Sequence, residues 1–262
     1  MPNDYIRCDI KKKYGISRKF YITYILIDRY MSLENYSWLT IKEVLRYYNA
    51  KITKHKPKAF TEIVNVLKYM NENKMIETQQ DLDSVSYDTG IKIAVKSNYF
   101  DLDGKYCMIP FNVFDKIMDS DTTVNKEAAL LSYLYIGSYI GGDVPQNQTE
   151  TDEQYLKRLK KYPKAFFRDI NNMAKDLSMS KDTLTKCINY LQKEGLIIKK
   201  TVGSIKRDGK PPQNVPNIYV LNQNGYKQEI EWALEKMKKN YNVDYFDEIK
   251  GGKQINEQHS KT

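Results

Sequence analysis

The sequence predicts an α+β fold, mainly α, in which two tandem units share one order of elements. Apolar residues recur at helical spacing in each half of the chain, over residues 60–70 and 184–191. An extended stretch follows each of these segments, as expected of a helix that leads into a strand. The 262 residues are enough for two domains of ordinary size.

The composition predicts a cytoplasmic protein that crosses no membrane. Mean hydropathy is −0.66, and the sequence contains no uncharged apolar run of the roughly 18 residues that a membrane-spanning helix needs. Residues 1–7 lack the basic and apolar regions of a secretion signal. The three cysteines lie far apart in the sequence, which fits thiols in a reducing compartment better than a disulfide framework.

The charge balance favours a polyanionic partner. Lysine and arginine number 42 against 33 acidic residues, for a formal net charge of +9. Phosphates that are neutralised by such side chains release counterions, which favours binding to nucleic acid. Lysine and tyrosine are also encoded by A/T-rich codons. The placement of the charges therefore has to decide between the two explanations.

The first half of the chain begins with a polar, basic segment. Residues 1–17 carry Lys11, Lys12 and Lys13 in succession, and we interpret this segment as an arm. Residues 18–30 are mostly apolar and aromatic, which predicts a buried helix.

Two further helices are predicted in this half. Residues 40–43 read Thr-Ile-Lys-Glu, a capping box that opens a helix ending near Tyr48. After a lysine-rich loop, Pro57 is expected at the first position of the next helix. The apolar face of that helix is formed by Phe60, Ile63, Val64, Leu67 and Met70.

Residues 81–109 predict β-structure. The turn sequences Asp88-Thr89-Gly90 and Asp103-Gly104 each interrupt an extended stretch, and we interpret both as hairpin turns. Helices are predicted again at residues 111–119 and 125–140, where runs of apolar residues return.

The last third of the chain gives the most specific pattern. Residues 170–177 predict a short helix, and the hydroxyl of Ser180 is suited to cap a longer helix that ends at Gly195. The small side chain of Ala174 allows the two helices to approach closely. In the longer helix, the spacing i, i+3, i+4, i+7 forms one buried face from Leu184, Cys187, Ile188 and Leu191.

Strands are predicted at residues 196–202 and 217–221, on either side of a flexible segment at 203–216, with a closing helix at 225–240. A helix-turn-helix followed by a β-wing has its elements in this order. The predicted organisation is a basic arm (1–17), an N-terminal domain (18–110), a C-terminal domain with a closing helix (111–245, with a flexible loop at 141–153) and a polar tail (246–262).

A second copy of this pattern lies upstream. Residues 63–70 align with residues 184–191, and the residues that open the following strands align as well. Lys74 stands where the other copy has Gly195, so Asn73 is expected to supply the left-handed cap. Two unrelated amphipathic helices that share a period are the alternative explanation.

Residues 173–197 closely resemble the helix-turn-helix of bacterial winged-helix DNA-binding proteins, at Ala174, Ser180, Thr183, Leu191, Gly195 and Leu196. The resemblance implies two tandem winged helix-turn-helix domains, one for each copy of the pattern. Two such domains in a basic chain resemble the replication initiators of bacterial plasmids and phages. Residues 106–114 and 127–135 are similar to the opening of initiator and DnaD-type primosomal domains, and residues 217–221 to a wing's return strand.

The helical period also identifies candidate DNA contacts. With its apolar face inward, the helix after Ser180 presents donor-rich side chains that suit phosphates and base edges, and Asn189 can pair with adenine. Residues 199–210 hold five basic side chains against one acidic, as in a wing that grips the DNA backbone or minor groove. The candidate DNA-binding residues are Ser180, Lys181, Thr185, Lys186, Asn189, Lys199, Lys200, Lys206, Arg207, Lys210, and, in the N-terminal copy, Lys54, Lys56, Lys58 and Thr61.

The sequence lacks the residue patterns of several enzyme classes. Its two histidines, His55 and His259, cannot form the His-x-His metal site of a rolling-circle nickase. No P-loop motif occurs. Asp101-Leu102-Asp103-Gly104 lacks the remaining ligands of a calcium loop. We therefore expect no enzymatic activity, no metal and no cofactor.

Three functions stay open at this point. We expect a sequence-specific double-stranded DNA-binding protein that acts as a plasmid or phage replication initiator or accessory protein. A transcriptional repressor or partition adaptor would use the same modules on DNA. A winged-helix module that recruits a helicase or its loader would bind protein instead. The expected partners are double-stranded DNA and replication proteins such as a helicase or loader, with no membrane and with homodimer formation left open.

Overall fold

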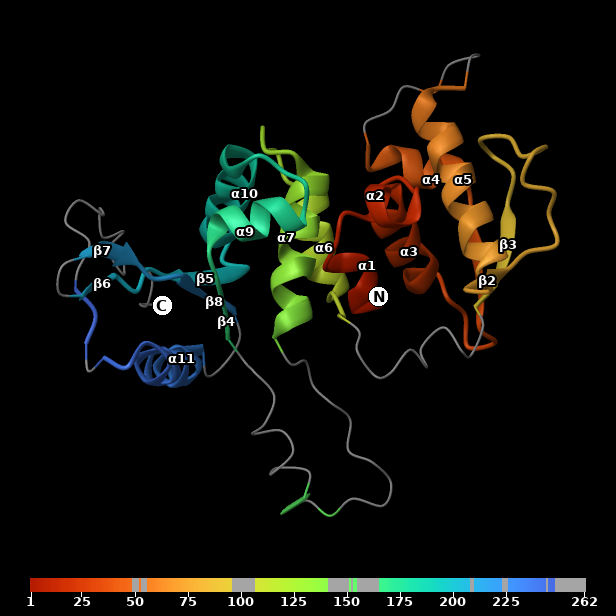
Figure 1. Cartoon of the computed structure of the whole chain (residues 1–262). Helices are drawn as coiled ribbons and strands as arrows, with labels where there is room; N and C mark the ends of the chain where they lie inside the picture. The colour runs from red at the N-terminus through yellow and green to blue at the C-terminus, as the bar shows by residue number, and fades with distance from the viewer. Residues whose placement is uncertain are drawn as a thin grey trace.

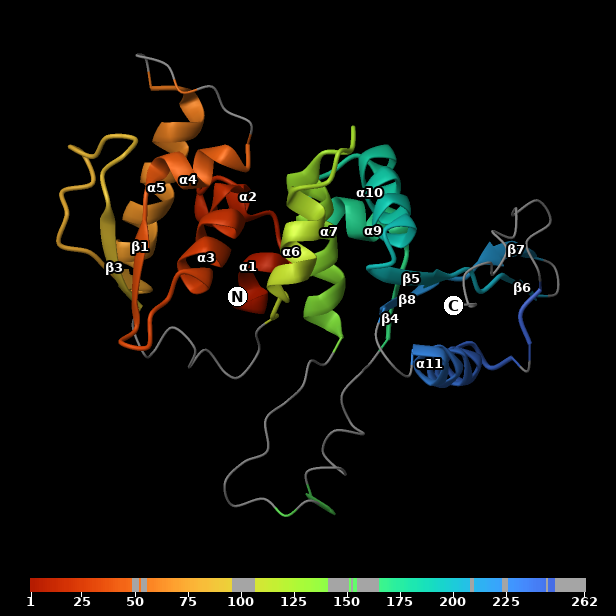
Figure 2. The ribbon, with the colours of Figure 1, turned by 180° about the vertical axis from the view of Figure 1, so that it is seen from behind.

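The computed structural model describes residues 1–48, 52, 56–95, 107–140, 151, 153–154, 165–207, 210–222, 226–243 and 245–247. These residues form an α+β fold in which helices predominate and the sheets are small and antiparallel, as the sequence predicts. Helices fill the middle of the molecule, and the two three-stranded sheets lie at its opposite ends (Figures 1 and 2). None of the helices in the described ranges combines the length and apolar character needed to cross a membrane.

The N-terminal unit runs as helix, strand, two helices and two strands. In its sheet, the last strand lies between the other two and is antiparallel to both. Its elements are α3 (Lys19–Arg29), β1 (Tyr36–Leu39), α4 (Ile41–Arg46), α5 (Lys58–Glu72), β2 (Ile76–Glu77) and β3 (Ile91–Val95).

The C-terminal unit repeats this order of elements and this arrangement of strands. Its last strand is again central and antiparallel to both neighbours. Its elements are α7 (Lys126–Tyr139), β4 (Phe166–Arg168), α9 (Ile170–Asp176), α10 (Lys181–Lys193), β5 (Ile197–Lys200) and β8 (Asn217–Leu221). A hairpin of β6 (Ser204–Arg207) and β7 (Lys210–Asn214) is inserted between β5 and β8.

Among the described residues, four helices lie outside the two repeats: α1 (Asn3–Ile6), α2 (Ile10–Tyr14), α6 (Phe111–Met118) and α11 (Tyr226–Tyr241). The last of these is the predicted closing helix. It packs on β8 through Ala233 and Met237, which are fully buried together with Ile218 and Val220 in a small second core.

The interpretation of residues 1–17 as an arm is corrected by the structure. Ile6 and Ile10 are almost fully buried, and α1 packs on α7. The Tyr21 hydroxyl donates a hydrogen bond of 2.8 Å to the carbonyl of Tyr5. Ile6 ends α1 and Ile10 begins α2, and the burial of both isoleucines holds the two short helices on the core. The segment is therefore part of the fold.

The predicted hairpin at residues 81–109 is also corrected. Asp88-Thr89-Gly90 lies in the connection of residues 78–90 between β2 and β3, which pair antiparallel, so it belongs to a long loop and is not a tight hairpin turn within residues 85–95. Leu82 and Val85 are buried, which draws residues 81–90 onto the core as a series of turns. The second turn sequence, Asp103-Gly104, lies outside the described residues.

The predicted starts of two helices, α4 and α5, are confirmed, and that of α5 is shifted by one residue. The hydroxyl of Thr40 accepts from the Glu43 N–H, and the Glu43 carboxylate accepts from the Thr40 N–H at 2.7 Å, which completes the capping box. Pro57 is the N-cap residue of α5 and not its first helical residue. The predicted loop at 141–153 lies largely outside the described residues, as does the tail after Asp247.

The helices α5 and α10 end in the same way. In α10, Gly195 adopts a left-handed φ of 67°, and the N–H of Leu196 donates to the carbonyl of Leu191. In α5, Lys74 takes the same position with a φ of 58°, whereas Asn73 has a φ of −87°. The prediction that Asn73 would supply the left-handed cap is therefore wrong, because the hydrogen bonds that close the helix place the turn one residue later.

We expect Lys74→Gly to stabilise the protein by about 1 kcal/mol. A side chain in the left-handed region destabilises the folded state by roughly 1–2 kcal/mol, and glycine removes this cost. Glycine is also more flexible in the unfolded chain, which offsets roughly 0.4–1 kcal/mol of the stabilisation. Urea denaturation of the two proteins measures the difference. Lys74→Ala, which keeps the strained backbone without the charge, is the matched control, and equal stabilisation by both changes would contradict the explanation.

One continuous core joins the two units. Helix α7 is buried at every position from Ala128 to Ser138, and α1, α6 and α10 all pack against it. The buried residues of the N-terminal unit and those of α7 and α10 belong to the same apolar cluster. The two units therefore share an interior and are not joined by a tether alone.

Candidate nucleic-acid interface

Helix α10 presents a polar face to solvent because its apolar residues all point at the core. Leu184, Cys187, Ile188 and Leu191 are fully buried, as predicted. The hydroxyl of Ser180 accepts from the N–H of Thr183 at 3.0 Å, which fixes the start of the helix. Among the candidate residues on the outer face, Lys181, Lys186 and Asn189 are exposed.

Two of the candidate polar side chains of α10, Lys186 and Thr185, already have partners within the helix. The Lys186 ammonium lies 2.8 Å from the Asp182 carboxylate, and this neighbour raises the pKa of Lys186. The Thr185 hydroxyl donates to the carbonyl of Lys181 at 2.8 Å. Lys186 would have to exchange Asp182 for a phosphate or a base edge, while the Lys181 ammonium forms no ion pair with a described residue.

The turn between α9 and α10 is short and tightly closed. The N–H of Met179 donates to the carbonyl of Ala174 at 2.9 Å, and Ala174 itself is buried, as its small size predicts. Leu177 fills the corner with an exposed fraction of 1%. This turn holds the N-terminal end of α10 clear of the core.

The predicted wing is a β-hairpin that continues from β5. Lys200 and Lys206 are exposed. Near the tip of the hairpin, Arg207 of β6 and Lys210 of β7 are opposite each other in the backbone register of the two strands. Lys199 is half-buried, and burial lowers its pKa. The hairpin extends outward from the C-terminal sheet, away from α7 and α10 and toward the end of the molecule where α11 lies (Figure 1). The structure thus brings a basic hairpin and helix α10 into one unit.

The N-terminal candidates lie in a different electrostatic environment. The Lys56 ammonium donates to the Val85 carbonyl at 2.9 Å and lies 4.5 Å from the centroid of the Phe60 ring. Lys58 is exposed, with the Glu62 carboxylate 3.9 Å away, and Thr61 is exposed beside it. Lys54 lies outside the described residues.

The loop from β2 to β3 occupies the place that the basic hairpin has in the C-terminal unit. This loop, residues 78–90, contains three acidic residues and no basic one. Asp83 forms an ion pair with Lys68 of α5, and Asp88 forms one with Lys42 of α4 at 2.7 Å. Lysines of the N-terminal unit are therefore directed to its own loop.

Sequence reasoning missed the side chains from the first eighteen residues that hold the turn before α10. Ser178, in that turn, is bound by Asp9 and Arg18, which lie about 160 to 170 positions away in the chain. No local pattern marks contacts of such long range. The nearest available signal was the presence of two large apolar residues, Ile6 and Ile10, in this polar segment, since isoleucine side chains are usually buried.

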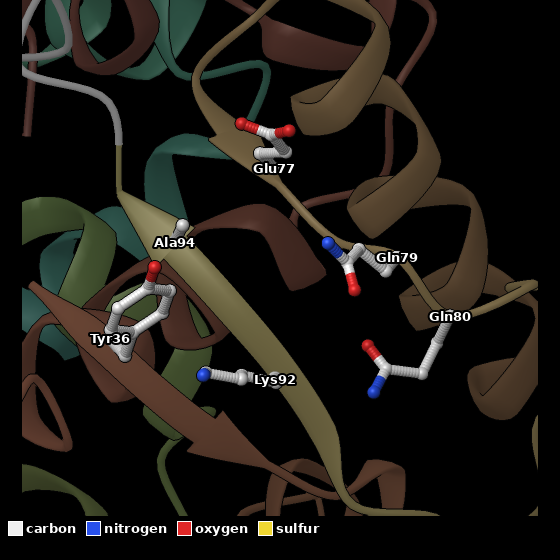
Figure 3. Close-up of a pocket in the computed structure, with 6 residues that line it drawn as sticks. All are labelled: Tyr36, Glu77, Gln79, Gln80, Lys92 and Ala94. Atoms are coloured by element: carbon white, nitrogen blue, oxygen red, sulfur yellow. The ribbon is translucent and has the colours of Figure 1, made fainter.

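A shallow cleft of about 180 Å³ lies on the outer face of the N-terminal sheet. Figure 3 shows that the side chains of Tyr36 and Lys92 project from neighbouring strands, and the Lys92 ammonium lies 4.0 Å from the centroid of the Tyr36 ring. None of the candidate DNA-binding residues lines this cleft, whose walls are Tyr36, Glu77, Gln79, Gln80, Lys92 and Ala94.

A comparison of the chain with known protein families finds no family that matches it, and a comparison with curated proteins finds no matching protein. The assignment of a function therefore depends on the fold, the charges and the resemblance of residues 173–197.

Proposed function

We propose that the protein is a sequence-specific double-stranded DNA-binding protein built from two winged helix-turn-helix domains. The support for this fold assignment is the order of elements. Each unit runs as helix, strand, two helices, strand, intervening segment and strand, with the last strand in the middle of the sheet. The end of the second helix pair, marked by Gly195 or Lys74, leads directly into a strand in both units.

The single observation that carries the function is the exposed polar face of α10, in one unit with a basic hairpin that β5 connects to that helix. Lys181, Lys186 and Asn189 supply donors to base edges and phosphates, and the hairpin that holds Lys200 and Lys206 supplies further positive charge. An α-helix fits the major groove of B-DNA, and a flanking hairpin reaches the adjacent backbone or minor groove. We assign the principal DNA contacts to this C-terminal unit.

The N-terminal unit has a smaller part in DNA binding in this proposal. Its exposed candidates on α5 are Lys58 and Thr61, while Lys56 is bound to Val85. The acidic loop of residues 78–90 would repel a phosphate backbone. That loop favours a second candidate function for this unit, the binding of a basic surface on a protein such as a helicase or its loader.

The biological role is proposed from the sequence resemblance. We propose a plasmid or phage replication initiator or accessory protein, whose target would be an array of repeats at an origin. A transcriptional repressor or partition adaptor would bind a single operator or a partition site with the same chemistry. Selection of bound sites from random duplexes tests this choice, because repeated motifs support the initiator and a single motif supports the repressor.

DNA binding through the hairpin predicts a defined salt dependence. We expect the double variant Lys200→Gln/Lys206→Gln to reduce the slope of log affinity against log salt by about two, because each phosphate contact contributes roughly one. Between 50 and 200 mM salt, the variant should then lose about tenfold less affinity than the wild-type protein. Fluorescence anisotropy with a labelled duplex measures both slopes.

Two outcomes would count against the proposed function. A wild-type protein with no affinity for duplex DNA at low salt contradicts DNA binding as such. A double variant with the wild-type slope contradicts the role of the hairpin. Lys227→Gln/Lys239→Gln on α11 is the matched control, because it removes the same charge from exposed positions on the other side of the C-terminal sheet from α10 (Figure 1).

A further inference from the structure

The turn before α10 is held by two side chains from the first eighteen residues. The Ser178 hydroxyl donates to the Asp9 carboxylate at 2.6 Å. The Arg18 guanidinium donates to the carbonyls of Leu177 and Ser178 at 2.6 and 3.2 Å. Ser178 is also the residue of this turn that adopts a left-handed φ, of 47°. The N-terminal segment thus binds the backbone that positions the proposed DNA-binding helix.

The same carboxylate fixes helix α2. Its other oxygen, Oδ1 of Asp9, accepts from the N–H groups of Lys11 and Lys12 at 3.1 and 3.2 Å and caps the helix. The hydrogen bond from Ser178 is the main reason that the pKa of Asp9 lies below its ordinary value. One aspartate therefore locks the start of α2 to the turn that precedes α10.

The buried side of α2 forces its lysines outward. Ile10 is buried, and the ring of Tyr14 stacks on that of Tyr5 with centroids 4.7 Å apart. Lys11 and Lys12 are exposed and form no ion pair with any described residue. These lysines stand beside the turn without the acidic partners that bind Lys42, Lys68 and Lys186 elsewhere in the chain.

We propose that Lys11 and Lys12 of α2 bind the DNA phosphate backbone next to the groove that receives α10. This inference rests on the proposed function of the C-terminal unit. When the N-terminal end of a recognition helix enters the major groove, the helix before it crosses the phosphate backbone. The α9–α10 turn then lies at the edge of the groove, and Asp9 and Arg18 place α2 at that edge.

The proposal makes the DNA-binding surface composite. Its base-reading residues come from α10, and part of its backbone clamp comes from a helix that precedes the N-terminal unit. A lysine that binds phosphate carries no sequence information by itself. Removal of these two lysines should therefore weaken binding to all duplexes alike and leave the preferred sequence unchanged.

The test uses the full chain with Lys11→Gln/Lys12→Gln. We expect the slope of log affinity against log salt to fall by about two, and the affinity lost between 50 and 200 mM salt to shrink by about tenfold. Site selection should return the wild-type sequence preference. The melting temperature should not change, because both side chains are exposed, and this measurement separates a lost contact from a lost fold.

The outcomes separate this inference from the function on which it rests. If the wild-type protein binds duplex DNA and Lys11→Gln/Lys12→Gln has the slope of the Lys227→Gln/Lys239→Gln control, the role of α2 is overturned and DNA binding stands. A wild-type protein that does not bind duplex DNA overturns both. A reduced slope together with a changed sequence preference overturns the assignment of Lys11 and Lys12 to the backbone alone.

Discussion

Replacement of Leu191 by alanine is expected to lower the free energy of unfolding by about 2–5 kcal/mol. Leu191 is fully buried on the face of α10 that packs against α7, and its carbonyl accepts the Leu196 N–H that closes the helix. Alanine and leucine have similar helix propensities, so the loss comes from the cavity and the buried area that disappears. Denaturation in urea, followed by circular dichroism, measures the change.

The matched control for this experiment is Asn189→Ala. Asn189 is on the same helix, two residues away, but it is exposed. A surface change of this kind should alter the free energy of unfolding by no more than roughly 0.5 kcal/mol. If Leu191→Ala has an effect as small as the control, α10 does not pack on α7 as described and its outer face is not defined.

The second large effect is expected in DNA binding. Lys186→Ala and Asn189→Ala should each weaken binding to the selected duplex by roughly 1–3 kcal/mol if these residues touch bases, and Asn189→Ala should also relax the sequence preference. Both residues are on the exposed face of α10. Because Lys186 is paired with Asp182, its removal also exposes an acidic group to the phosphates.

The ion pair of Lys186 with Asp182 allows a control variant that should change the DNA affinity in the opposite direction. Asp182→Asn leaves Lys186 unpaired and should strengthen binding at low salt. Titrations of one labelled duplex with the three variants compare the effects directly. Footprints that are unchanged in both Lys186→Ala and Asn189→Ala would remove α10 from the groove and leave the hairpin as a nonspecific contact.

Features that depend on neighbouring residues could be predicted from the sequence. The capping box at residues 40–43, the cap at Ser180 and the left-handed Gly195 each require only residues within one helical turn, and the structure contains all three. The apolar period of α5 and α10 likewise identified their buried faces. Local hydrogen bonds and side-chain spacing are sufficient for these features.

Contacts between distant segments could not be predicted in this way. A turn sequence such as Asp88-Thr89-Gly90 suggests a tight hairpin, but Leu82 and Val85 are buried in the core, and residues 78–90 form a long loop between the paired strands β2 and β3. The three lysines in residues 1–17 led to the prediction of an exposed arm, whereas two isoleucines in the same segment are buried in the core.

In the candidate site, too, the features set by neighbouring residues could be predicted and the contacts between distant segments could not. Periodicity placed Lys181, Lys186 and Asn189 on the outside of α10, where the structure has them. It gave no indication that Lys56 is bound by Val85 or that Asp9 is bound by Ser178, because each contact joins residues that only the tertiary fold brings together. A sequence pattern identifies a face of a helix but not the segments that cover or support it.

The core that runs through α7 has a consequence for any double-stranded target. Because α5 and α10 belong to units with a common interior, the distance and the angle between these two helices are nearly fixed. B-DNA turns once in about 10.5 base pairs, so sites for the two helices would have to keep one angular phase around the duplex axis. Insertion of half a turn of DNA between them would leave one helix facing solvent.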